Sequence, residues 1–126
     1  MHFLPKEPFV IISANTESQY WRDAVLQSQN LKTRLMQLNI AFKVVSGCFE
    51  GKTEVSYYIP WIELDRAIAL AKEFGQKTVS VVDHFRNAKL VYTNGDPAKD
   101  LGIFEIGEDD KNYTIDDGIK YVCTGA

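Results

Sequence analysis

The stretch SGCFEGKTEVSYYI, residues 46–59, predicts the end of one β-strand, a tight polar turn and the start of a second strand. Gly47, Gly51 and Lys52 form the predicted turn, because glycine adopts backbone angles that turns require. Glu54 stands where the second strand is expected to begin, and apolar residues at alternate positions follow it. The stretch therefore predicts a hairpin with a carboxylate at its entrance.

This carboxylate has aromatic neighbours. Phe49, Tyr57 and Tyr58 lie close to Glu54 in the sequence, and aromatic faces attract cations by about 0.5–2 kcal/mol each. A small cationic ligand is therefore one candidate for this place. The simpler interpretation is a hairpin with a surface glutamate, and the residues alone favour it.

Composition excludes several classes of protein. The chain has 126 residues and a formal charge of −3, so we expect a single domain over residues 1–126 and no basic surface for nucleic acid. Cys48 and Cys123 show neither metal-ligand spacing nor a disulfide framework. We expect no metal site, no membrane segment and, in the absence of a signal peptide, a cytoplasmic location.

The order of elements predicts the fold. Apolar runs and capping signals indicate a strand at 9–12, a helix at 16–38, strands at 40–45 and 54–59, a helix ending near Gly75, and strands at 78–82 and 88–92. This β-α-β-β-α-β order is typical of an α+β, ferredoxin-like antiparallel sheet with two helices on one face. The rest of the chain adds C-terminal strands. Because the strands are apolar on both sides, we expect another subunit to cover the open face.

Other candidate sites have plain alternatives. Ser13, Ala14 and Asn15 join the first strand to a helix, where backbone N–H groups can bind a carboxylate, although an ordinary strand-to-helix connection is the favoured explanation. Asp83 and His84 have the composition of an acid–base pair, but also of a simple turn. Acidic turns at 108–110 and 116–117 lack calcium-loop spacing.

Several pieces of the chain together resemble a known family. These pieces are Lys6-Glu7-Pro8 ahead of a strand ending in Ser13-Ala14, Gly47-Cys48-Phe49 followed by Glu54, Arg66-Ala67 with Ala71, Gln76 before a valine-rich strand, Leu90-Val91-Tyr92 with Gly95, Gly102 with Phe104, and Tyr113-Thr114-Ile115-Asp116. In this order they are similar to the small bacteriophage enzymes that degrade S-adenosylmethionine (SAM), the SAM lyases formerly called SAM hydrolases. The chain also resembles a related bacterial domain family of unknown function.

The resemblance implies a site and an assembly. Glu54 takes the role of the family's key active-site acid, while Phe49 stands where the family has a tyrosine, so that Tyr57 or Tyr58 is the substitute hydroxyl. We expect the substrate to be bound around Glu54 by Ser13, Ala14, Asn15, Phe49, Tyr57 and Gln76. The family also implies a homotrimer with SAM at the subunit interfaces, and a reaction that needs no added cofactor.

The implied activity is SAM cleavage to methylthioadenosine and homoserine lactone, used by phages against SAM-dependent host restriction and methylation. Hydrolysis with Glu54 as a general base is the nearest alternative. A non-enzymatic module that binds SAM or a nucleotide, and an inhibitor of a host protein, are the other two.

Overall fold

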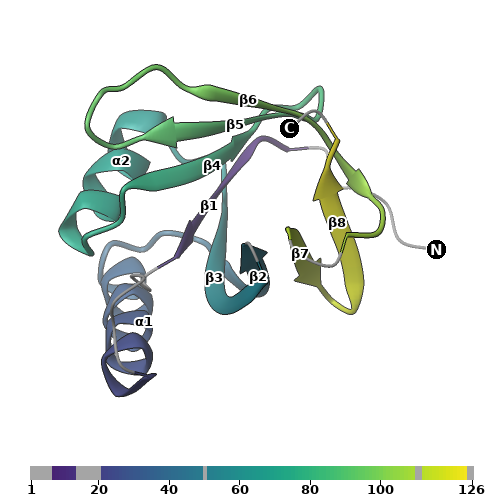
Figure 1. Cartoon of the computed structure of the whole chain (residues 1–126). Coiled ribbons are helices and arrows are strands. Elements are labelled where there is room, and N and C mark those ends of the chain that lie inside the picture. Colours follow the sequence, from purple (N-terminus) through teal and green to yellow (C-terminus); the bar gives the residue numbers. More distant parts are fainter. Residues whose placement is uncertain (1–6, 14–20, 50, 110–111, 125–126) are drawn as a thin grey trace.

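The computed structural model describes residues 7–13, 21–49, 51–109 and 112–124. Eight strands and two helices occur within these ranges (Figure 1). In chain order they are β1 (Phe9–Ser13), α1 (Trp21–Gln37), β2 (Lys43–Phe49), β3 (Lys52–Pro60), α2 (Leu64–Glu73), β4 (Thr78–Val82), β5 (Asn87–Tyr92), β6 (Lys99–Ile106), β7 (Tyr113–Asp116) and β8 (Ile119–Cys123).

The strands form a closed antiparallel barrel in the order β1-β3-β2-β7-β8-β6-β5-β4. The first four strands lie side by side as β4-β1-β3-β2, with the helices between them in the chain. The prediction of a ferredoxin-like fold is nevertheless wrong, because the sheet does not end at β4 and β2. Strand β5 pairs with β4, β7 pairs with β2, and β6 and β8 join these two edges.

Closure of the barrel explains why the strands are apolar on both sides. Successive side chains of a strand point to opposite faces, so Val10 and Ile12 pack towards the helices while Phe9 and Tyr58 pack inside the barrel. Helix α2 contacts β1 and β4, and α1 contacts β3 (Figure 1). The chain's own strands therefore cover the face for which the sequence predicted a second subunit.

A tight turn brings the last two strands together. Asp117 and Gly118 connect β7 to β8 and have φ values of 51° and 78°. Two consecutive residues with positive φ are the pattern of the two-residue hairpin turn whose twist matches the flanking strands, and Asp-Gly is a favoured pair for it. The acidic turn at 116–117 therefore has a structural role in completing the barrel.

Two neighbouring residues of β6 test the closure. Phe104 is 5% exposed and packs on Phe9 and Tyr121, with ring centroids 5.3 and 5.2 Å away, whereas Ile103 is 39% exposed. We expect Phe104→Ala to lower the free energy of unfolding by about 3–5 kcal/mol and Ile103→Ala by less than about 1 kcal/mol, both measured by urea denaturation. Equal losses would contradict an enclosed barrel interior.

Candidate active site

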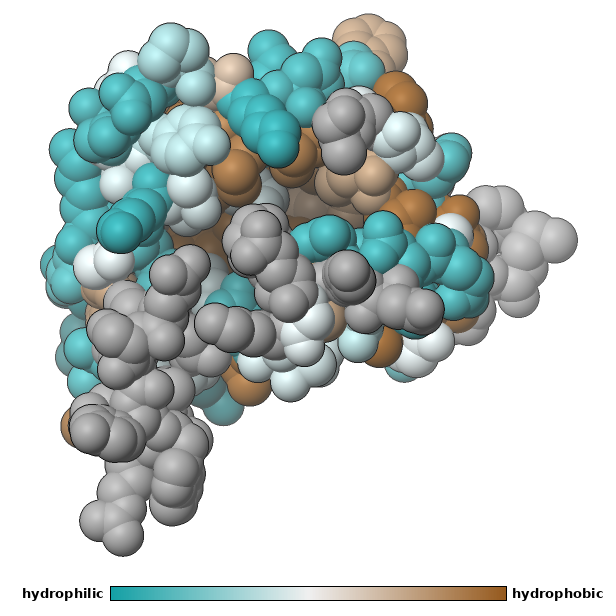
Figure 2. Space-filling view, in the orientation of Figure 1, coloured by the Kyte–Doolittle hydropathy of each residue, from teal (hydrophilic) through white to brown (hydrophobic). Residues whose placement is uncertain are grey.

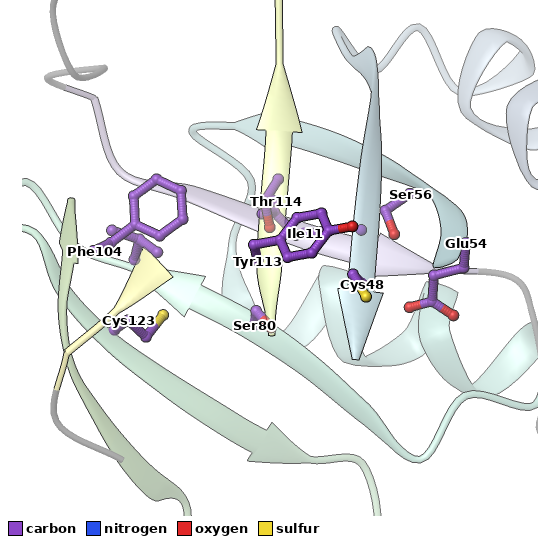
Figure 3. Close-up of a pocket in the computed structure, with 12 residues that line it drawn as sticks. Ile11, Cys48, Glu54, Ser56, Ser80, Phe104, Tyr113, Thr114 and Cys123 are labelled. Atoms are coloured by element: carbon purple, nitrogen blue, oxygen red, sulfur yellow. The ribbon is translucent and has the colours of Figure 1, made fainter. Parts of the chain in front are cut away.

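The barrel interior contains a cavity of about 150 Å³. Every strand contributes to its lining, which consists of Ile11, Gly47, Cys48, Glu54, Ser56, Ser80, Val82, Ala88, Phe104, Tyr113, Thr114 and Cys123. Figure 2 shows the molecule hollowed on one face, with apolar surface at depth and mostly hydrophilic residues around it. Glu54 lies at one end of the lining and Phe104 at the other (Figure 3).

Strand alternation directs Glu54 into this cavity. Glu54 is the third residue of β3, so it lies inside the strand and not at its entrance. Its partner across the ladder is Gly47 of β2, which the sequence had placed in the turn. That prediction is wrong because β2 runs on to Phe49, which leaves only residues 50 and 51 between the two strands. Ser56 follows on the same face and pairs with Ser13 of β1.

The electrostatic setting of Glu54 is unusual. Burial raises the pKa of its carboxyl above the ordinary value of 4.5, and a hydrogen bond with the Ser13 side chain offsets part of that rise. All the other residues that line the cavity are apolar or uncharged polar. An ionised Glu54 therefore has no cationic partner among the described lining residues, and a cationic ligand would supply one.

Gly47 keeps the space beside Glu54 open. Its φ is not among the positive values that glycine alone adopts easily, so the backbone itself does not require glycine there. A Cβ atom at this position would lie 3.1 Å from Oγ of Ser56 and 3.6 Å from Cγ of Glu54. The absent side chain therefore preserves cavity volume at the carboxylate.

The hydroxyls of both tyrosines of β3, the predicted substitutes for the family's tyrosine, bond to residues outside the cavity lining. Tyr57 is 2% exposed and points towards α1, where its hydroxyl donates to the Ser28 carbonyl oxygen at 2.8 Å and lies 2.9 Å from the Ser28 Oγ. Tyr58 faces the barrel interior, but its hydroxyl donates to Glu7 at 2.8 Å. Its ring stacks on Phe9 at 4.3 Å. The tyrosine that does line the cavity is Tyr113.

The other predicted binding residues divide into three groups. Ala14 and Asn15 lie outside the described residues, and so does the side chain of Phe49. Ser13 lies beside Glu54, as its hydrogen bond shows. Gln76 precedes β4 by two residues and is not among the lining residues; its carbonyl oxygen accepts from the Thr93 hydroxyl at 3.0 Å.

The C-terminal strands contribute lining residues that no local sequence pattern predicts. Tyr113 and Thr114 enter the cavity because β7 pairs with β2, with Thr114 opposite Gly47 and Tyr113 opposite Cys48. The motif Tyr113-Thr114-Ile115-Asp116 was noticed only as part of the resemblance. Its proximity to Gly47 has no local signal, because more than 60 residues separate the paired segments.

The remaining candidates have structural explanations. Oδ1 of Asp83 accepts hydrogen bonds from the backbone N–H groups of Phe85 and Asn87 at 2.9 and 3.0 Å, and His84 packs on the Phe85 ring, so this pair forms a turn. Within the described ranges, no group of three or more His, Cys, Asp or Glu residues is placed to hold a metal ion. No helix in the described part of the chain has the length and apolar character needed to span a membrane.

Comparison with known proteins identifies the family. The family model described as the S-Adenosylmethionine lyase family matches residues 10–124, which is nearly the whole chain and includes every strand that lines the cavity except the first residue of β1. This match indicates a SAM-cleaving enzyme in general terms. A search of curated proteins finds no match.

Tyr57→Phe tests whether this residue serves the fold or the site. We expect a loss of about 1 kcal/mol in the free energy of unfolding, because the buried hydrogen bonds to Ser28 disappear. The kcat/KM for SAM should stay within about twofold of wild type, since the side chain lies outside the cavity. A large fall in kcat/KM with unchanged stability would place Tyr57 at the substrate after all.

Proposed function

Because the chain belongs to the S-adenosylmethionine lyase family, we propose that it cleaves SAM into methylthioadenosine and homoserine lactone. The observation that carries the proposal is the half-buried carboxylate of Glu54 in a cavity whose other described lining residues carry no charge. SAM presents two cationic groups, its sulfonium and its ammonium, close to a carboxylate. The cavity is therefore complementary in charge to the methionyl part of SAM.

The proposed reaction uses only groups of the substrate. The SAM carboxylate attacks its own γ-carbon, a C–O bond forms, and the bond between that carbon and the sulfonium sulfur breaks. The electron pair passes to sulfur, which leaves as the neutral thioether of methylthioadenosine, and the lactone keeps the ammonium. Because opposite charges disappear in this step, an environment that excludes water favours it over bulk solvent.

The protein's contribution is to bind and orient. Glu54 holds the ammonium group, and the narrow lining folds the methionyl chain so that the carboxylate approaches the γ-carbon. Such positioning contributes up to about 7–11 kcal/mol in favourable intramolecular reactions. No base is needed, since the attacking carboxylate is already ionised at neutral pH.

Hydrolysis is the second candidate, and one observation favours it. The raised pKa of Glu54 makes its carboxylate a stronger base than an exposed glutamate. In that reaction Glu54 takes a proton from water, and the product is homoserine. Detection of homoserine lactone early in the time course supports the lyase reaction, whereas homoserine as the first product supports hydrolysis.

We further propose a homotrimer with the active sites at its interfaces, as the resemblance implies. The cavity of about 150 Å³ is smaller than the roughly 300–1,000 Å³ of sites that enclose a whole ligand. It accommodates the methionyl part, so the adenosine would lie outside it, against a neighbouring subunit. A role for a phage in the host cytoplasm, against SAM-dependent restriction and methylation, is consistent with this activity.

Light scattering at micromolar concentration tests the assembly. We expect the mass of three chains of 14.3 kDa, and activity that falls on dilution together with the trimer. A fully active monomer would show that one chain completes the site.

Glu54→Gln tests the proposed function. Glutamine keeps the shape but removes the charge that attracts the ammonium group, and a charge-assisted hydrogen bond is about twice as strong as a neutral one. We expect kcat/KM for SAM to fall by at least about 10²-fold, measured by methylthioadenosine formation. The matched control is Glu105→Gln on β6, which is exposed and lies outside the cavity, and should retain wild-type turnover.

The same variant should not be less stable at neutral pH. Burial raises the pKa of Glu54 in the folded protein, so its ionisation above that pKa destabilises the native state relative to the unfolded chain. Glutamine removes this cost. We expect the Tm of Glu54→Gln to exceed that of wild type at pH 7, and the difference to shrink below pH 4.5, where Glu54 is protonated in both states. Loss of turnover with a lower Tm at pH 7 would indicate misfolding instead.

A further inference from the structure

Ser56 is a buried hydroxyl that opens on the cavity. It follows Glu54 by two residues on the same face of β3, lines the cavity and is only 2% exposed. Among the described residues, the fully buried side-chain atom that lacks a partner is Nη1 of Arg86 and not Oγ of Ser56, so this hydroxyl is reached from the cavity. Ser56 therefore has a donor and acceptor available to a molecule in the cavity.

Gly47 is what leaves this hydroxyl accessible. A methyl group at position 47 would lie 3.1 Å from Oγ of Ser56, which is closer than nine in ten real contacts of a Cβ atom. Any larger side chain would cover the hydroxyl. The neighbouring Ser13 is engaged differently, because its side chain is hydrogen-bonded to Glu54. Ser80 and Thr114 also line the cavity, but they are less buried and lie on other strands.

The described residues that line the cavity offer the substrate carboxylate no cation. Lysine and arginine are absent from this described lining, so hydroxyl groups are the natural donors to an anion there. We propose that the Ser56 hydroxyl donates a hydrogen bond to the carboxylate of SAM, and so fixes the attacking group; this inference rests on the proposed SAM-cleaving function. Glu54 and Ser56 then bind the ammonium and the carboxylate of the same α-amino acid head group.

The spacing suits this head group. Residues two apart in a strand are separated by about 6.6 Å, at about 3.3 Å per residue. Serine is short and glutamate is long, so the Glu54 carboxylate can reach back towards a ligand that Ser56 contacts. Both groups of the ligand are carried by one carbon atom, which fits two contacts from one face of a single strand.

A neutral donor also suits the chemistry. A lysine or arginine would form an ion pair with the carboxylate, and that attraction would be lost as the carboxylate becomes a lactone ester. A hydroxyl orients the group while leaving more of its charge available for attack. The bond from Ser56 is charge-assisted in the substrate complex and weaker in the product complex.

The test compares SAM with decarboxylated SAM, which keeps the sulfonium and an ammonium but lacks the carboxylate. For Ser56→Ala we expect kcat/KM for SAM to fall about 10- to 100-fold, the size of a hydrogen bond to a charged group. The dissociation constant of decarboxylated SAM, measured by titration calorimetry, should stay within about twofold of wild type. Glu54→Gln should instead weaken binding of decarboxylated SAM, because that ligand retains the cations.

Two further variants complete the design. Thr33→Ala is the control, since Thr33 is exposed on α1 and is not among the residues that line the cavity or the surface beside Glu54. Gly47→Ala should also lower kcat/KM for SAM, but because its Cβ would lie 3.1 Å from Oγ of Ser56 and 3.6 Å from Cγ of Glu54, it should weaken binding of decarboxylated SAM as well. If Ser56→Ala weakens both ligands equally, or leaves kcat/KM unchanged, the inference is wrong while the proposed function stands. A wild-type protein that neither cleaves SAM nor binds decarboxylated SAM overturns the proposed function, and the inference with it.

Discussion

The pairing of β7 with β2 is the interaction on which the rest of the molecule depends. Ser46, Gly47 and Cys48 pair with Ile115, Thr114 and Tyr113 respectively, and these pairs close the sheet into a barrel. Without them Phe104 and Tyr121 would lose the opposite wall against which they pack, and Glu54 would lie on an open face in water. The raised pKa of its carboxyl is a consequence of burial, so barrel closure produces the electrostatic property that the proposed chemistry uses.

The side chains of strand β3 alternate between two faces, and residues on one face stabilise the fold while residues on the other line the cavity. Tyr57 and Ile59 face the helices and belong to the core beneath them, while Glu54 and Ser56 face the interior cavity. Tyr58 is an exception on the inner face. It points into the barrel, but there it packs on Phe9 and its hydroxyl donates to Glu7. A shift of one residue in register would exchange the two sets, so the packing of α1 and α2 also fixes which residues reach the substrate.

Local signals in the sequence predicted local structure well. The strand at 78–82 has the predicted bounds, and Glu54, which the hairpin pattern singles out, lines the cavity. Tyr57 follows Glu54 closely in sequence but faces α1, because odd and even positions of a strand point to opposite faces, so its predicted role at the substrate remains a prediction. The barrel was not predicted, because segments more than 60 residues apart in the chain close it. In addition, the apolar pattern of β2 would be the same whether another subunit or the chain's own C-terminal strands covered its second face.

The unfavourable free energy of burying an ionised Glu54 also makes the site selective for a cationic ligand. An ionised carboxylate in a cavity without a cation is poorly solvated, and a bound ammonium group replaces the missing solvent. In the proposed reaction the substrate carboxylate becomes an ester, so its bond with Ser56 weakens while the contact of Glu54 with the ammonium remains. Methylthioadenosine has lost its positive charge and has no ionic contact left in the cavity. The same two residues that hold SAM therefore hold neither product as tightly, which favours release after each turnover.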